Sequence, residues 1–191
     1  RRQTTTPVPT EFEDLFLGNQ RFRTDNGPLI EELAEDGQHP RYLFLGCSDS
    51  RVAEGTVFDA LPGTLFTERN IANLFESGDA NAQAVVAYGV EHLHTRHVIV
   101  MGHYGCGGVA ASIASQPAAP WDDATAAIEA WIAPIRSLYS TSTRPEIVAL
   151  RAANALLPVA PTPGLEEPGF RALVEENVKR TVSNIASNAV V

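Results

Sequence analysis

The stretch RYLFLGCSDSR, residues 41–51, joins a buried strand directly to a run of polar, reactive side chains. Residues 41–45 form a short apolar run, which is typical of a strand buried on both faces. A second stretch, HVIVMGHYGCGG at residues 97–108, repeats this construction. The chain has only two cysteines, and each follows one of the two apolar runs. Because ligands collect at the carboxyl ends of parallel strands, we expect Cys47 and Cys106 to lie at one edge of a sheet.

The segments around these two runs alternate between strand and helix patterns, which predicts an α/β fold. We expect a mostly parallel central sheet flanked by helices, with right-handed connections between strands. The glycines that follow the second run allow a tight turn into a helix that begins near Val109. Strands are expected at residues 41–46, 64–68 and 97–101, and the longer helices at residues 80–93, 123–139, 145–156 and 170–186.

The N-terminal part of the chain divides into two segments. Residues 1–10 carry no apolar pattern, and we expect them to be disordered or extended. Residues 11–191 are expected to form a single domain, which starts with an N-terminal helical arm. The arm is predicted as one helix with an apolar face over residues 12–22 and a second helix over residues 29–35 that ends at Gly37.

The composition argues against several classes of function. The chain has 191 residues and a formal net charge of −9, which disfavours binding to nucleic acid or to an anionic membrane. No apolar run is long enough for a membrane span, and the opening ten residues have no apolar core, so we expect neither a membrane segment nor a signal peptide. We expect a cytoplasmic protein. The mitochondrion is the alternative, because the opening is rich in Arg and Thr and lacks acidic residues.

Three side chains near the expected sheet edge suit a zinc ion. Cys47, His103 and Cys106 offer two thiolates and an imidazole, a donor set that zinc favours. Three protein donors leave a fourth position open, as in a catalytic site. Two other interpretations remain: the cysteines are small buried residues beside an ordinary loop histidine, or Cys47 and Cys106 form a redox-active bridge.

Asp49 and Arg51 follow Cys47 directly and form a second candidate pair. In an extended turn, residues two apart can point the same way, so the guanidinium can hold the carboxylate with two hydrogen bonds. An aspartate held in this way stays ionised, and it can accept a hydrogen bond from a zinc-bound hydroxide or bind the metal itself. The alternative is a surface ion pair of little consequence.

These motifs together resemble those of the β-class carbonic anhydrases. The resemblance runs from about Glu11 to the end of the sequence and is weakest over residues 115–168. It rests on Cys47-Ser48-Asp49-Ser50-Arg51, on Pro62-Gly63 and Arg69-Asn70, and on Gly102-His103 with Cys106-Gly107-Gly108.

The resemblance implies a zinc enzyme that hydrates carbon dioxide to bicarbonate and a proton by means of a zinc-bound hydroxide. One zinc ion per chain would be bound by Cys47, His103 and Cys106, with Asp49 and Arg51 as the catalytic dyad. The family also implies a homodimer or homotetramer, with N-terminal helices that reach over the neighbouring subunit. Its substrate pocket is shared across the dimer interface, and the residues at the matching positions are Gln38, Phe66 and Tyr88.

The sequence departs from the family pattern at two places. Some members carry a tryptophan of an allosteric bicarbonate site three residues before the first zinc cysteine, where this chain has Phe44, so we expect no such regulation. The family also continues beyond Val191 into another strand, which this sequence does not contain. One alternative function is hydrolysis of carbon disulfide or carbonyl sulfide on the same scaffold, because these linear substrates need the same metal hydroxide. The other, suggested by the missing strand, is a low-activity zinc-binding protein with a non-catalytic role.

Overall fold

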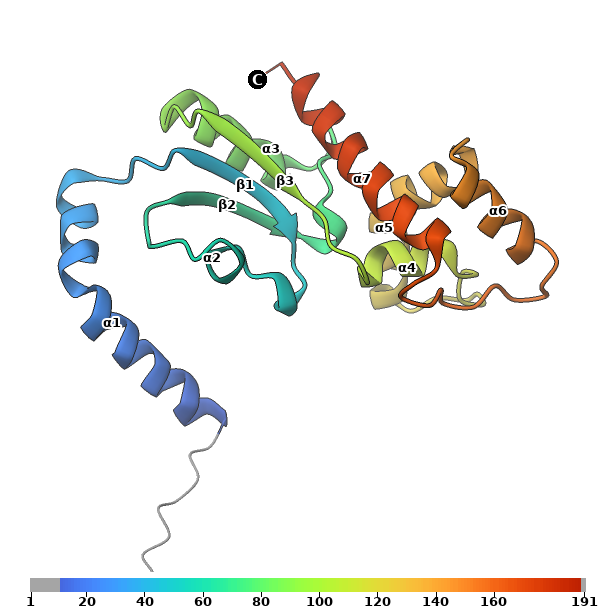
Figure 1. The fold of residues 1–191 in the computed structure, drawn as a ribbon, viewed down its shortest axis with the longest axis horizontal. Helices are drawn as coiled ribbons and strands as arrows, with labels where there is room; N and C mark the ends of the chain where they lie inside the picture. The colour runs from blue at the N-terminus through green and yellow to red at the C-terminus, as the bar shows by residue number, and fades with distance from the viewer. Residues whose placement is uncertain (1–10, 190–191) are drawn as a thin grey trace, which may run out of the picture. The chain divides into compact units, whose positions relative to one another are not determined.

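The computed structural model describes residues 11–189 and divides into two compact units, which border one another in sequence between Gln38 and His39 (Figure 1). The predicted disordered segment, residues 1–10, lies outside the described residues. The described part of the first unit is almost entirely helix α1 (Glu11–Asp36). The helix ends at Gly37, whose φ of 80° is a conformation that glycine adopts easily.

The prediction of two separate helices in this unit is wrong, because α1 is continuous through Pro28. Asn26-Gly27-Pro28 looks like a break in the sequence. A proline inside a helix removes one backbone hydrogen bond, and the freed carbonyl group of an exposed helix can bond to water instead. The side chains of Thr24 and Asn26 also donate to carbonyl oxygens one turn earlier, at 3.0 Å each.

The second unit contains a three-stranded parallel sheet with the order β2-β1-β3. The strands are β1 (Tyr42–Cys47), β2 (Leu65–Asn70) and β3 (His97–Met101), which confirms the predicted parallel α/β architecture. Strand β1 is central, and its side chains from residue 43 to residue 45 are fully buried. The register aligns Cys47 with Asn70, so the carboxyl ends of β1 and β2 lie side by side.

Helices pack around this sheet and around one another (Figure 1). One cluster of buried side chains joins β1 to helices α3 and α7, and a second joins the end of β1 to α4, α5, α6 and α7. The longer helices are α3 (Ala80–Ala87), α4 (Gly107–Ile113), α5 (Asp123–Thr141), α6 (Pro145–Asn154) and α7 (Pro168–Ala186). No helix in residues 11–189 is long and apolar enough to cross a membrane.

Helix α3 does not run as regular α-helix to residue 93 as predicted. It changes at Tyr88 into a π-helical turn, η3 (Tyr88–His92). Gly89 in this turn lies directly over β1, where a Cβ atom would come within 2.3 Å of Leu43 Cδ1. The close approach of the turn to the central strand thus requires a residue without a side chain.

The opposite face of the sheet carries an apolar groove. Phe44 contacts Phe58 edge to face there, with 6.0 Å between the ring centroids. The groove has a volume of about 540 Å³, and its lining includes Tyr42, Phe58, Leu61 and Ile99. Leu61 is 65% exposed, so part of this apolar surface faces solvent within the unit.

Candidate metal centre

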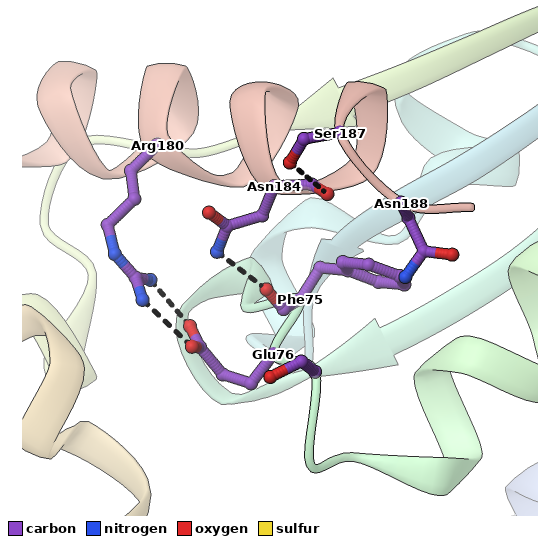
Figure 2. A pocket seen from close by; sticks show the side chains of 7 residues that line it. Phe75, Glu76, Arg180, Asn184, Ser187 and Asn188 are labelled. Atoms are coloured by element: carbon purple, nitrogen blue, oxygen red, sulfur yellow. Dashed lines mark hydrogen bonds and ion pairs between the residues drawn. The ribbon is translucent and has the colours of Figure 1, made fainter. Parts of the chain in front are cut away.

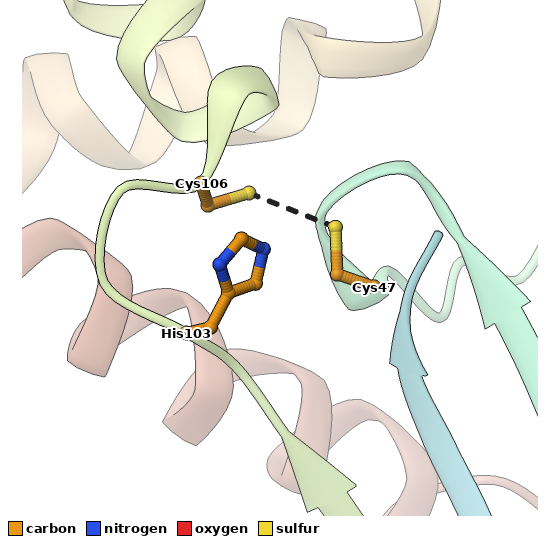
Figure 3. Close-up of side chains that lie close together, drawn as sticks. All are labelled: Cys47, His103 and Cys106. Carbon is orange, nitrogen blue, oxygen red and sulfur yellow. Dashed lines mark hydrogen bonds between the residues drawn. The ribbon is translucent and has the colours of Figure 1, made fainter. Parts of the chain in front are cut away.

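The three predicted zinc ligands come from three separate elements that meet at the carboxyl edge of the sheet (Figure 3). Cys47 is the last residue of β1, and Cys106 is the N-cap of α4. His103 lies in the short loop between β3 and α4. Their candidate ligand atoms all lie within 4.8 Å of one another. Among the described residues, this is the only group of three or more such side chains close enough to hold a metal ion.

The spacing of these atoms fits a tetrahedral zinc ion. Two sulfurs bound to one tetrahedral ion at the usual Zn–S distance lie about 3.8 Å apart. The Cys47 and Cys106 sulfurs are 3.9 Å apart, and both cysteines are free thiols rather than a disulfide. The donor separation therefore matches a shared metal ion.

His103 presents one ring nitrogen to the same space. Its Nδ1 lies 3.2 Å from the carbonyl oxygen of Tyr104, and because a carbonyl only accepts, this nitrogen carries the proton. The other nitrogen, Nε2, is then an acceptor with a free lone pair. It is buried and has no hydrogen-bond partner among the described residues, which is a costly state for a polar atom unless a ligand binds there.

The hydrogen bond between the two sulfurs shifts the pKa values of the two thiols in opposite directions. A hydrogen bond from Cys106 lowers the pKa of Cys47 to about 5, against the opposing effect of burial. The same bond and burial raise the pKa of Cys106. Backbone hydrogen bonds from Asp49 and Ala72 lower the pKa of Cys47 further, and those from Val109 and Gly108 act against the raised pKa of Cys106. These donors stabilise thiolates, which are the form that binds a metal.

Asp49 and Arg51 form the forked pair that their spacing predicts. The guanidinium donates from Nε to Asp49 Oδ1 at 2.9 Å and from Nη2 to Oδ2 at 2.7 Å, and the Arg51 amide adds a bond of 2.9 Å to Oδ1. These hydrogen bonds hold the pKa of the Asp49 carboxyl well below its usual range. Asp49 Oδ2 lies 3.8 Å from His103 Nε2, so the carboxylate borders the metal centre.

Arg69 fixes the backbone that carries Cys47 and Asp49. Its guanidinium donates to the carbonyl oxygen of Cys47 at 2.9 Å and to that of Asp49 at 2.7 Å. Arg69 also lies 3.7 Å from a carboxylate oxygen of Glu54. It therefore ties the end of β1 to the end of β2.

The predicted substrate-pocket residues lie away from this centre or in the other unit. Phe66 and Tyr88 contact each other, with 5.7 Å between their ring centroids. Phe66 lies four residues before Asn70, the partner of Cys47 in the sheet, so it is near the start of β2 rather than at its carboxyl end. Gln38 belongs to the N-terminal unit. Their assignment to a pocket remains a prediction.

The turn that follows β2, the 3₁₀ turn η2 (Ile71–Asn73), is not predicted from the sequence. Ala72 in this turn is fully buried and has a φ of 61°, in the left-handed region that residues other than glycine rarely adopt. Its amide is one of the donors to Cys47. No local sequence pattern indicates that an alanine adopts this conformation. The preceding Arg69-Asn70 motif indicates only that this part of the chain lies near the site.

Comparison with known proteins agrees with this geometry. The family model described as carbonic anhydrase matches residues 42–191. A carbonic anhydrase of Emericella nidulans is 34% identical over 157 residues, which are 81% of this chain and 59% of the relative. The β carbonic anhydrase 5 of Arabidopsis thaliana, described as chloroplastic, is 37% identical over 114 residues, or 58% of this chain and 38% of the relative. The chain thus spans less than two thirds of the length of these curated relatives.

Solved structures show the same fold. The β-carbonic anhydrase CafA of Aspergillus fumigatus superposes with a TM-score of 0.73 at 30% identity, covering 95% of this chain and 78% of that one. A Coccomyxa β-carbonic anhydrase in complex with acetazolamide gives a TM-score of 0.73 at 26% identity, with 98% and 75% coverage. A tetrameric β-carbonic anhydrase from Sordaria macrospora gives 0.72 at 25% identity, with 94% and 82% coverage.

Proposed function

This chain belongs to the β-class carbonic anhydrase family, and on that basis we propose that it catalyses the reversible hydration of carbon dioxide to bicarbonate and a proton, with one zinc ion per chain. The observation that carries the proposal is the convergence of Cys47, His103 and Cys106 on one point, with the lone pair of a buried imidazole nitrogen unused. When bound, zinc would supply the Lewis-acid chemistry that makes water a nucleophile near neutral pH.

Asp49 would orient the attacking water. Both of its carboxylate oxygens accept hydrogen bonds from Arg51, and the carboxylate stays ionised far below neutral pH. An ionised acceptor 3.8 Å from His103 Nε2 is placed to take a hydrogen bond from a water molecule beside the metal ligands. The carboxylate would therefore select one orientation of the nucleophile.

Arg51 would keep Asp49 in position to orient the water molecule and would prevent it from binding the metal directly. Its Nη2 also donates to the carbonyl oxygen of Gly105 at 3.1 Å, inside the loop that bears His103 and Cys106. The same guanidinium therefore holds the carboxylate and the ligand-bearing loop together. We propose that water, rather than Asp49, takes the fourth position during turnover, and that the dyad orients it.

A second subunit would complete the substrate pocket. Gln38, Phe66 and Tyr88 would line it across the interface of a homodimer or homotetramer. Two surfaces support such an assembly: the apolar groove on the open face of the sheet, and the exposed Phe12 and Phe16 of helix α1. The tetrameric Sordaria macrospora relative is consistent with this proposal. We place the protein in the cytoplasm, with the mitochondrion as the alternative.

The decisive test combines metal content with stopped-flow hydration of carbon dioxide. The wild-type chain should hold one zinc ion per chain and hydrate carbon dioxide, and Cys106→Ser should lose both properties. Stripping the wild-type protein with a chelator and restoring zinc controls for loss of folding, since activity should return. A variant that retains its zinc and its rate would contradict the assignment.

The same experiment separates the alternatives. Sulfide release from carbon disulfide or carbonyl sulfide, without hydration activity, would indicate a hydrolase on the same scaffold. Stoichiometric zinc without either activity would indicate a zinc-binding protein with a non-catalytic role. Thiol titration of the metal-free chain should find two thiols, and a value of zero would reveal a redox-active bridge between Cys47 and Cys106.

A further inference from the structure

Five consecutive backbone carbonyl groups after β2 each accept a hydrogen bond from a side chain. We call residues 70–75 the clamped turn. Carbonyl groups of a connecting segment usually bond to water or to other backbone, so a complete set of side-chain partners is unusual. The donors are Trp131 to Ile71 at 2.8 Å, Asn177 to Ala72 at 2.8 Å, Thr181 to Asn73 at 3.0 Å, Asn70 to Leu74 at 2.8 Å and Asn184 to Phe75 at 2.9 Å.

Helix α7 supplies three of the five donors from one face. Asn177, Thr181 and Asn184 are spaced by four and three residues, so they lie along a single stripe of the helix. Figure 2 shows the last of these bonds, in which the Asn184 amide reaches the carbonyl oxygen of Phe75. Asn177 is 1% exposed and Thr181 is fully buried. The helix thus buries polar groups where apolar residues would pack without a desolvation cost.

Asn177 keeps this position at a further cost. Its Oδ1 is buried and has no hydrogen-bond partner among the described residues. An apolar side chain of similar size would avoid that cost, so the benefit of Asn177 must come from its amide donor. That donor binds the carbonyl group of Ala72.

The clamped turn holds a backbone conformation that would otherwise relax. Ala72 has a φ of 61° and Asn73 a φ of 48°, so two successive residues with side chains are left-handed. Each such residue costs about 1–3 kcal/mol and persists only where the surroundings enforce it. The bonds from Asn177 and Thr181 end on the carbonyl oxygens of these two residues, so they enforce the strained conformation directly.

The strained turn faces the metal centre. Ala72 belongs to the same buried cluster as Cys47 and Cys106, and Gly108 at the start of α4 lies close against it. A hydrogen bond from the Ala72 backbone also lowers the pKa of Cys47. The φ angle of Ala72 sets the orientation of its backbone amide relative to the carbonyl groups of Ala72 and Asn73, which α7 holds. A relaxed φ would therefore shift the amide relative to the sulfur. Hydrogen bonds to metal-bound thiolates orient the ligand and tune its basicity, so the shape of the turn acts on the metal site.

We propose that Asn177 and Thr181 are positioning residues for the metal centre. They hold the left-handed clamped turn so that the Ala72 amide stays on the Cys47 sulfur, and they thereby raise the affinity of the site for zinc. This inference rests on the proposed zinc site but assigns it residues on a helix that carries none of the ligands. Neither residue is one of the three candidate ligands.

The test measures metal binding rather than turnover. Asn177→Leu removes the amide donor and keeps the number of side-chain heavy atoms, and Thr181→Val replaces only the hydroxyl group by a methyl group. Asn184→Leu is the matched control, because it deletes the same type of bond from the same helix but at Phe75, three residues beyond Ala72. Zinc affinity is measured by competition with a chromogenic chelator, and the thiolate-to-metal charge-transfer band is recorded after cobalt(II) substitution. Circular dichroism of each metal-free variant reports folding.

Asn177→Leu should weaken zinc binding by about tenfold or more, as loss of an outer hydrogen-bond partner of a ligand typically does. Thr181→Val should shift it in the same direction, and it carries the test if Asn177→Leu does not fold. Both variants should move the cobalt charge-transfer band to longer wavelength, because the sulfur loses a donor. Asn184→Leu should leave affinity within about twofold and the band unchanged, since the Ala72 amide is kept.

Equal zinc affinity and identical cobalt spectra for the wild type and the two folded test variants would overturn the inference alone. An equal loss in Asn184→Leu would also overturn it, because the effect would then be a general loss of packing by α7. A wild-type chain that binds neither zinc nor cobalt would instead refute the proposed function, and with it the inference.

Discussion

Replacing Gly108 by alanine should destabilise the metal-free protein, whereas the same change at the adjacent Gly107 should not. A Cβ atom at Gly108 would lie 2.8 Å from Ile71 Cγ2 and 3.1 Å from the Cβ of Ala72. A Cβ atom at Gly107 would meet no atom within 4 Å. Both glycines lie in the first turn of α4, so the two substitutions share the same gain in helix propensity.

The size of the effect follows from what can move. Ile71 is 42% exposed and can rotate away from the new methyl group, but Ala72 is fully buried. The hydrogen bonds of the clamped turn also prevent Ala72 from retreating. Inserting a methyl group into such a contact costs about 1–3 kcal/mol. Because the propensity gain cancels between the two variants, Gly108→Ala should be less stable than Gly107→Ala by about that amount.

Thermal unfolding of both variants in the presence of a chelator measures this difference without a contribution from bound metal. In a protein of this size each kcal/mol lowers the melting temperature by about 2–4 °C, so Gly108→Ala should melt about 2–12 °C below Gly107→Ala. Equal melting temperatures would show that the clamped turn can move away from the added methyl group at little cost. That result would refute the claim that the hydrogen bonds of the turn hold Ala72 in a fixed position beside the metal centre.

Three further predictions concern the metal centre. Arg51→Gln should keep its zinc but hydrate carbon dioxide about 100-fold more slowly in stopped-flow assays, because Asp49 loses the donors that orient it; a change below threefold would contradict the dyad. Zinc affinity, measured by chelator competition, should rise about tenfold per pH unit between pH 7 and 8.5. In that range the pair retains one proton, since the pKa of Cys47 is lowered and that of Cys106 is raised, and binding must release it; a flat affinity would show that no proton is released. The hydration rate should increase from neutral to mildly alkaline pH, because two thiolates make the metal a weaker Lewis acid than three imidazoles would, and a flat rate would count against this.

The positions of the three candidate ligands could be predicted because each depends on a local signal. Cys47 and Cys106 both follow short apolar runs that form parallel strands, and the ends of parallel strands meet at one edge. Of these strands β1 is buried, whereas β3, at the edge of the sheet, is partly exposed. The Asp49–Arg51 fork also depends only on a spacing of two residues. By contrast, the continuity of α1 through Pro28 could not be predicted, because a proline that breaks most helices is tolerated in an exposed one.

The clamped turn could not be predicted because its cause lies far away in the sequence. Asn177 and Thr181 are more than 100 residues from the carbonyl groups they hold. In the sequence of α7, Asn177 and Thr181 appear only as polar residues that interrupt an apolar helix face. Trp131 borders the buried cluster around the metal centre. Its indole also donates to Ile71, which no helical pattern would indicate.

The sequence motifs identify the metal ligands, but residues far from these motifs hold the ligands in position. The end of β1 and the loop between β3 and α4 supply the ligand atoms. Ligand atoms on flexible segments would bind a metal ion weakly, because ordering them on binding costs conformational entropy. Arg69 ties down the backbone of Cys47 from one side, and the clamped turn presents an amide to its sulfur from the other. Helix α7 must be in place before that turn can take its left-handed shape, since an isolated turn would relax. Metal affinity should consequently be lost together with the docking of α7, at a point in unfolding where β1 and its cysteine are still intact.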